Sequence, residues 1–89
     1  MLAYGIKIYF TDGDWNYYYG TLDGSTTCGK TECNIRCFET QSEAWEEVHR
    51  IERNWNSIKD SYGNVKYIDH CVLVKCNYWS NNNLVKVPL

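Results

Sequence analysis

The N-terminal residues alternate with a period of two. One set is Leu2, Tyr4, Ile6, Ile8 and Phe10, and the set between them is Ala3, Gly5, Lys7 and Tyr9. Because successive strand residues point to opposite faces, this pattern predicts a strand over residues 2–10. A turn-forming run follows, and its Asp12-Gly13 pair is typical of a β-hairpin. We therefore predict an antiparallel second strand over residues 15–19.

Two further segments complete the N-terminal half. Residues 20–30 are rich in Gly, Ser, Thr and Asp and show no periodicity, which predicts a loop. A short third strand is expected over residues 33–38. Its two faces would carry Cys33, Ile35 and Cys37 on one side, and Asn34, Arg36 and Phe38 on the other.

A helix start is marked by the run Thr40-Gln41-Ser42-Glu43, which has the form of a capping box. An apolar stripe then recurs at spacings of three and four residues: Ala44, Val48, Ile51, Trp55 and Ile58. This stripe predicts an amphipathic helix of about 19 residues. Its opposite side, which we expect in solvent, carries Glu46, Glu47, Arg50, Arg53 and Asn54.

The C-terminal third reads as a hairpin. Gly63 suits the positive φ of a turn, and residues 65–78 form a long strand-like run. Its expected faces are Ile68, Val72, Val74 and Cys76 on one side, and Tyr67, Cys71 and Leu73 on the other. Apolar groups on both sides predict a central strand. After a turn at residues 80–83, residues 84–87 would pair as a last strand.

These elements predict one α+β domain spanning residues 1–89. We expect an antiparallel sheet of four to five strands, with one amphipathic helix packed on one face, in the order β-β-β-α-β-β. The chain has nine Lys and Arg against eleven Asp and Glu, and no basic run, which argues against a phosphate-tracking surface. The N-terminus lacks the form of a signal peptide and no apolar stretch approaches about 20 residues, so we expect a cytoplasmic protein without a membrane span.

A metal site could be formed by five cysteines: Cys28, Cys33, Cys37, Cys71 and Cys76. Their spacing departs from the two-to-four-residue gaps usual in structural zinc arms, and Cys71 and Cys76 would lie on opposite faces of one strand. Buried free thiols are the favoured interpretation, with Cys28 the most exposed, so we expect no metal and no cofactor.

Two runs imitate catalytic or nucleotide motifs. In Asp69-His70-Cys71, strand alternation keeps the imidazole of His70 away from the thiol of Cys71. The run 24–31 ends in Gly-Lys-Thr but lacks the glycine placement of a phosphate loop and is not expected to precede a helix. We therefore expect no enzymatic activity.

The aromatic residues are the more informative feature, since four Trp, eight Tyr and two Phe exceed what one helix can cover. Exposed Tyr and Trp are typical of protein interfaces. The candidate partner-binding residues on an open sheet face are Tyr9, Trp15, Tyr17, Tyr19 and Tyr67. The competing interpretation is that these rings complete the core.

A second candidate surface is acidic. Glu43, Glu46 and Glu47 lie at the start of the predicted helix, where negative charge also suits the helix dipole. A solvated helix face explains them. The alternative is an imitation of nucleic-acid phosphates, although Arg50 and Arg53 interrupt the charge.

The junction Phe38-Glu39-Thr40-Gln41-Ser42-Glu43-Ala44 and the order of elements around it resemble small orphan proteins of phages and mobile elements of the anti-CRISPR or anti-defence type. The resemblance implies a non-enzymatic inhibitor that blocks a host nuclease complex by occupying its surface. Its partner would be a larger host protein or ribonucleoprotein complex in the host cytosol, with no membrane and no direct nucleic acid, and a homodimer is compatible with it. The alternative is a single-strand nucleic-acid stacking module or a DNA mimic that uses the acidic helix face.

Overall fold

The computed structural model describes residues 2–22, 25–59, 62–78 and 84–88. Its elements are β1 (Leu2–Phe10), β2 (Trp15–Leu22), β3 (Ser25–Gly29), the 3₁₀ helix η1 (Glu32–Asn34), α1 (Gln41–Asn54), β4 (Ser57–Lys59), β5 (Val65–Tyr78) and β6 (Leu84–Pro88). All pairings between these strands are antiparallel. The predicted α+β class, with one amphipathic helix on an antiparallel sheet, is confirmed.

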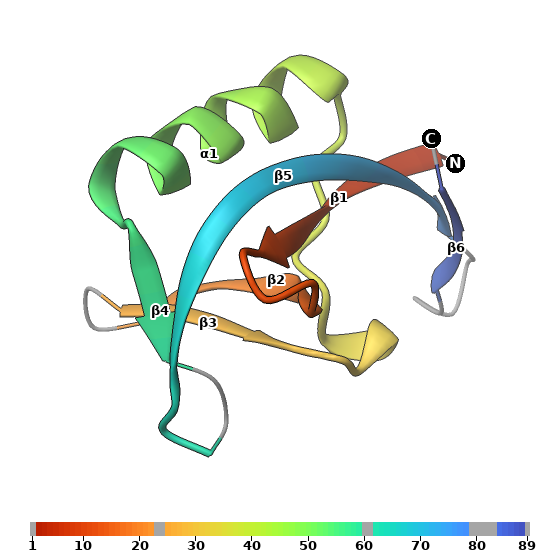
Figure 1. Cartoon of the computed structure of the whole chain (residues 1–89). Coiled ribbons are helices and arrows are strands. Elements are labelled where there is room, and N and C mark those ends of the chain that lie inside the picture. The colour runs from red at the N-terminus through yellow and green to blue at the C-terminus, as the bar shows by residue number, and fades with distance from the viewer. Residues whose placement is uncertain (1, 23–24, 60–61, 79–83, 89) are drawn as a thin grey trace.

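The sheet has the strand order β3-β2-β1-β5-β4, and β6 adds to β5. β5 arches across the molecule beneath α1, with β4 along its first residues and β6 along its last (Figure 1). The predicted central place of the long strand is therefore correct. Gly63 has φ 83°, as the turn before β5 requires. The predicted turn at residues 80–83 lies outside the described residues.

The alternation of β1 is confirmed by its burial. Ile6, Ile8 and Phe10 are buried on the face that α1 covers, where they form one core with Ala44, Val48 and Ile51. The hairpin after β1 closes through a hydrogen bond from the Phe10 amide to the Asp14 carbonyl. This turn places β2 beside β1, with Tyr9 paired to Trp15.

The helix begins where the capping box predicts. The Thr40 hydroxyl accepts a hydrogen bond from the Glu43 amide at 3.2 Å. The predicted length of about 19 residues is wrong, because Trp55 adopts extended dihedrals (φ −134°, ψ 124°) and ends α1 after 14 residues. Asn54, Asn56 and Ser57 favour such an end, since their side chains compete for backbone hydrogen bonds. Nowhere in the described ranges does a helix have the length and apolarity that crossing a membrane requires.

Ile58, the last residue of the predicted helical stripe, belongs to β4 instead. It is 6% exposed and still packs in the core beneath α1. The stripe therefore identified a core residue correctly but assigned it to the wrong element. A three-residue strand after a helix offers no periodicity long enough to separate the two cases.

The third strand is displaced from its predicted place. Residues 33–38 contain the end of η1 and an irregular segment, which meets the sheet at a bridge between Phe38 and Tyr4 and at a hydrogen bond from the Arg36 amide to the Tyr18 carbonyl. The strand is β3, inside the predicted loop, where it pairs with β2 around a bulge at Tyr19. β-Branched Thr26 and Thr27 suit a strand, but the flanking glycines and serine obscured that signal.

The irregular segment covers part of the sheet face opposite α1. Ile35 packs there with Ala3, Val74 and Cys76 in a second, smaller core. Gly5 makes this contact feasible, because an added Cβ would lie 2.5 Å from Ile35 Cδ1. The described side chains of β1 and β2 on the rest of that face are half-buried, so it is only partly covered.

The predicted faces of β5 hold for Cys71 and Cys76, which are buried in different cores. The prediction for Ile68 is wrong, since it packs with Cys71 and Leu73 in the core beneath α1. The cause is a register shift against β1, where Tyr9 pairs with His70 but Phe10 pairs with Ile68. This bulge leaves Asp69 unpaired in the ladder and reverses the alternation on its N-terminal side.

Candidate functional site

The open part of the sheet face opposite α1 carries a cluster of rings around one lysine. We call it the aromatic face, and it consists of Lys7, Tyr9, Trp15, Tyr17 and His70. The residues come from three adjacent strands, since β1 lies between β2 and β5. The register brings them together by pairing Lys7 with Tyr17, and Tyr9 with both Trp15 and His70.

The rings of this face are ordered by contacts with one another. Tyr9 and His70 stack with their centroids 4.8 Å apart and their planes 12° apart. Trp15 meets Tyr17 edge to face at 5.1 Å and 68°. Lys7 Nζ lies 4.9 Å from the Tyr9 centroid and 4.2 Å from that of Trp15, within cation–π range of both. The surface is therefore largely formed before any partner binds.

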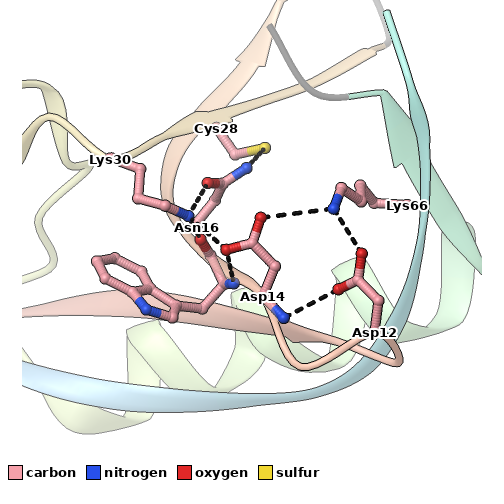
Figure 2. A network of polar contacts seen from close by, with 7 residues as sticks. Asp12, Asp14, Asn16, Cys28, Lys30 and Lys66 are labelled. Carbon is pink, nitrogen blue, oxygen red and sulfur yellow. Dashed lines mark hydrogen bonds and ion pairs between the residues drawn. The ribbon is translucent and has the colours of Figure 1, made fainter. Parts of the chain in front are cut away.

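A second lysine, Lys30, also contacts the Trp15 ring. Lys30 Nζ lies 4.4 Å from the Trp15 centroid. Figure 2 shows its polar partners: it donates to Asp14 Oδ1 at 2.9 Å, to Asn16 Oδ1 at 3.0 Å and to the carbonyl of Trp15. The hydrogen bond from Lys30 lowers the pKa of Asp14 to about 2, so this carboxyl is ionised at neutral pH.

The same network ties the hairpin to β5. Lys66 Nζ lies 2.5 Å from Asp12 Oδ2 and 3.4 Å from Asp14 Oδ2 (Figure 2). Its hydrogen bond to Asp12 raises the pKa of Lys66 and lowers that of Asp12. The base of the aromatic face is thus held by side chains that leave Trp15 little freedom.

Lys7 differs from these two lysines in its partners. Within the described ranges no carboxylate forms an ion pair with it, whereas Lys30 pairs with Asp14 and Lys66 with Asp12 and Asp14. Its ammonium group lies over the rings of Tyr9 and Trp15, and an ion pair supplied from outside would add to those contacts. Lys7 therefore places a positive charge at the centre of the aromatic face, where an anionic group of a partner could pair with it.

The structure brings three of the five predicted aromatic residues together: Tyr9, Trp15 and Tyr17. Tyr19 instead binds the chain leading to η1, because its hydroxyl accepts a hydrogen bond from the Thr31 amide at 2.6 Å. Tyr67 is 59% exposed on the β4–β5 hairpin, where it pairs with Ser57, and in the described part of the chain it has no ring contact with the aromatic face.

Sequence reasoning missed Lys7 and His70 of the aromatic face, and Lys30 beside it. Lys7 and Tyr9 share a face by simple alternation, so their proximity could have been predicted from the sequence. Lys30 reaches Trp15, and His70 reaches Tyr9, through contacts between segments distant in the sequence, which no local pattern predicts.

The predicted acidic surface is not uniformly negative. Glu43, Glu46 and Glu47 line a shallow hollow along α1, and the other residues that line it are Arg36, Phe38, His49, Arg50 and Arg53. The Glu47 carboxylate accepts hydrogen bonds from the buried Tyr18 hydroxyl at 2.5 Å and from Arg50 Nε at 2.5 Å. Its charge is therefore used within the fold, where it ties α1 to β2.

This contact shifts the ionisation of Glu47. The hydrogen bond from Arg50 lowers the pKa of the carboxyl, and it outweighs partial burial, which acts in the opposite direction. Burial is also the main cause of the raised pKa of Tyr18, so its hydroxyl remains a donor at neutral pH. Arg50, expected in solvent, in fact also donates to the Thr21 hydroxyl at 2.9 Å.

Acid should therefore destabilise the fold partly through Glu47. Because its pKa is lower in the folded state, its ionised form stabilises the protein above the unfolded-state pKa of about 4.3, and this contribution is lost as the pH falls through the folded-state pKa. In urea midpoints measured from pH 7 down to about pH 3, Glu47→Gln should show a shallower acid limb than the parent. Glu46→Gln, an exposed neighbour, is the matched control. An acid limb identical to the parent's in Glu47→Gln would contradict the assignment.

The thiol of Cys71 is not activated by the imidazole next to it in the sequence. Cys71 is a buried thiol whose pKa is raised to about 12 by burial, so it is protonated at neutral pH. Its neighbour His70 contacts Asp69 at 2.7 Å and Tyr9 on the opposite face, as strand alternation predicts. Cys28, expected to be the most exposed, is half-buried and accepts a hydrogen bond from Asn16 Nδ2 at 3.3 Å. No three His, Cys, Asp or Glu residues in the described ranges are grouped to hold a metal ion.

Comparisons with known proteins add no relative to this picture. No family model matches the chain, and neither a curated protein nor a solved structure matches it.

Proposed function

We propose that this chain is a non-enzymatic binding module that docks a larger protein through the aromatic face. The observation that carries the proposal is a set of rings on an open sheet face, held in place before binding and arranged around Lys7. Tyr and Trp give large contact areas with few rotatable bonds, so little conformational entropy is lost when such a surface is covered. This is the behaviour expected of a stoichiometric binder.

The charge of the face supports a partner with an acidic surface. Lys7 is the lysine of the face without a carboxylate partner among the described residues, and it sits between the rings of Tyr9 and Trp15. A partner that places an Asp or Glu at this point gains a charge-assisted hydrogen bond inside a ring-lined, partly desolvated site. We therefore expect the partner surface to be acidic where it meets Lys7.

An inhibitory role follows from this mode of binding, because a rigid domain that covers an acidic surface blocks whatever else uses it. A host protein or ribonucleoprotein complex of a defence system, the partner suggested by the resemblance to anti-defence proteins, fits the proposal and stays a prediction.

The second candidate is a single-strand nucleic-acid stacking module, favoured by lysines interleaved with aromatic rings. The ring faces weigh against it. His70 and Lys7 both lie against the Tyr9 ring, and Lys7 and Lys30 both lie over the Trp15 indole. A base that stacks on these rings would compete with such groups for the ring faces, whereas a protein side chain can pack beside them.

A pull-down separates the two candidates. The tagged full chain is incubated with host lysate, with and without nuclease treatment, and retained proteins are identified by mass spectrometry. The proposal expects a protein that is retained after nuclease treatment and is lost from a Lys7→Glu bait but not from a Glu43→Lys bait, the matched charge reversal on α1. Retention that disappears with nuclease, together with salt-sensitive binding to an isolated oligonucleotide, would replace the proposal with the second candidate.

A further inference from the structure

Two edge strands of the sheet, β3 and β4, face each other across a cleft. β3 and β4 stand at opposite ends of the strand order, yet the curvature of the sheet brings them to the two sides of one cavity of about 300 Å³. Figure 1 shows β4 beside β3 on the side where α1 ends. The cleft is lined by Thr26 of β3, by Trp55 after α1, and by Ser57, Ile58 and Lys59 of β4. Two strands that are far apart in the strand order therefore lie on the two sides of one cleft.

Thr26 gives this cleft an unsatisfied polar group. Its residue is only 9% exposed, and its Oγ1 is buried without a hydrogen-bond partner in the described structure. The next residue shows the usual arrangement, because Thr27 Oγ1 donates to the Gly20 carbonyl at 2.9 Å. Buried hydroxyls are normally paired, so an exception that lines a cavity points to a ligand group that completes it.

The main chain on both sides of the cleft also has amide and carbonyl groups that pair with no other described strand. In the described pairings β3 bonds only to β2 and β4 only to β5, so each presents one open edge. Such edges bind extended peptides by adding a strand, with alternate side chains entering the neighbouring cavity. Lys59 stands exposed on the rim, and no carboxylate among the described residues forms an ion pair with it.

We propose that this cleft is a second binding site, which takes an extended acidic peptide segment of a partner protein as an added strand. One inward side chain of the peptide hydrogen-bonds to Thr26 Oγ1 and packs against the half-buried Trp55 ring, while a carboxylate of the peptide meets Lys59. The site is on a different part of the sheet from the aromatic face, so it stands or falls independently of the proposed function.

The test begins with a phage-displayed library of random linear peptides selected on the immobilised full chain. Enriched peptides are then synthesised and titrated against the ¹⁵N-labelled protein by NMR. We expect acidic sequences that shift the amides of Ser25–Gly29 and Ser57–Lys59, and a Kd that is at least tenfold weaker for Thr26→Val. Selected peptides that shift Lys7, Tyr9 and Trp15 instead, or whose Kd is the same for Thr26→Val, would overturn the proposal.

Thermal melts supply a second readout that does not depend on finding a peptide. Thr26→Val replaces an unpaired buried hydroxyl with a methyl group of the same shape, so the Tm should hold or rise. Thr27→Val, the matched control, removes a hydroxyl that is bonded and should lower the Tm while leaving peptide affinity unchanged. A lower Tm for Thr26→Val would show that its hydroxyl already has a partner within the fold and would overturn the proposal.

Discussion

Replacing Ile51 by alanine should lower the free energy of unfolding by about 2–5 kcal/mol, a large part of the roughly 5–15 kcal/mol that holds a small domain together. Ile51 is fully buried in the core between α1 and the sheet, where it packs with Ile6 and Ile8 of β1. The loss combines the transfer of the missing methylene groups with the cavity left among stiff β-strand neighbours. Urea unfolding followed by circular dichroism measures it directly.

Glu52→Ala provides the matched control, because Glu52 is exposed on the same turn of α1. Its effect should stay within about 0.5 kcal/mol. Equal effects of the two substitutions would mean that α1 does not present Ile51 to the sheet. Arg50→Ala is unsuitable as a control, since Arg50 binds Glu47 and Thr21 and lies over the Trp55 ring.

The parts of the fold that could be predicted from the sequence are those with long local signals. β1 shows five alternating apolar residues, the start of α1 has its own capping residue, and β5 is a run of 14 residues. In each case the local pattern and the tertiary packing favour the same structure. The predictions of residues 2–10, of the helix start at Thr40 and of residues 65–78 were accordingly correct.

The errors lie where short segments take their structure from distant partners. β3 is made by pairing with β2, and β4 by pairing with β5, although neither segment has a strand-like pattern of useful length. The segment around Ile35 is irregular, and its place is fixed by a contact with Gly5 and by the hydrogen bond from the Arg36 amide to the Tyr18 carbonyl. Such contacts are not encoded in a period of two or 3.6 residues.

The residues of the candidate site could likewise be predicted only in part. The excess of aromatic residues over what one helix can cover predicted rings on the other face of the sheet, and the structure gathers Tyr9, Trp15 and Tyr17 there, each half-buried. Counting could not separate these from Tyr19, whose hydroxyl holds Thr31. It also could not place His70 over Tyr9, since that contact depends on the register between β1 and β5.

If the aromatic face is the working surface, Lys7→Glu should weaken partner binding by about 2 kcal/mol or more, roughly 30-fold in Kd. The substitution reverses the charge at the centre of the face and sets it against the acidic partner surface that we propose. Stability should change little, because Lys7 forms no ion pair with a described residue and its cation–π contacts lie on an accessible surface. Binding is measured by isothermal titration with the purified partner, and stability by urea unfolding.

Two further variants separate charge from packing. Lys7→Met keeps an unbranched stem over Tyr9 and Trp15 but removes the charge, so its loss of affinity should be smaller than that of Lys7→Glu and should shrink as salt is raised. Arg53→Glu reverses a charge on the exposed part of α1 and should leave affinity unchanged. The opposite ranking, with Lys7→Glu neutral and charge reversal at Glu43 or Glu46 abolishing binding, would move the working surface to the acidic side of the helix, because only there would a basic partner find its counter-charge.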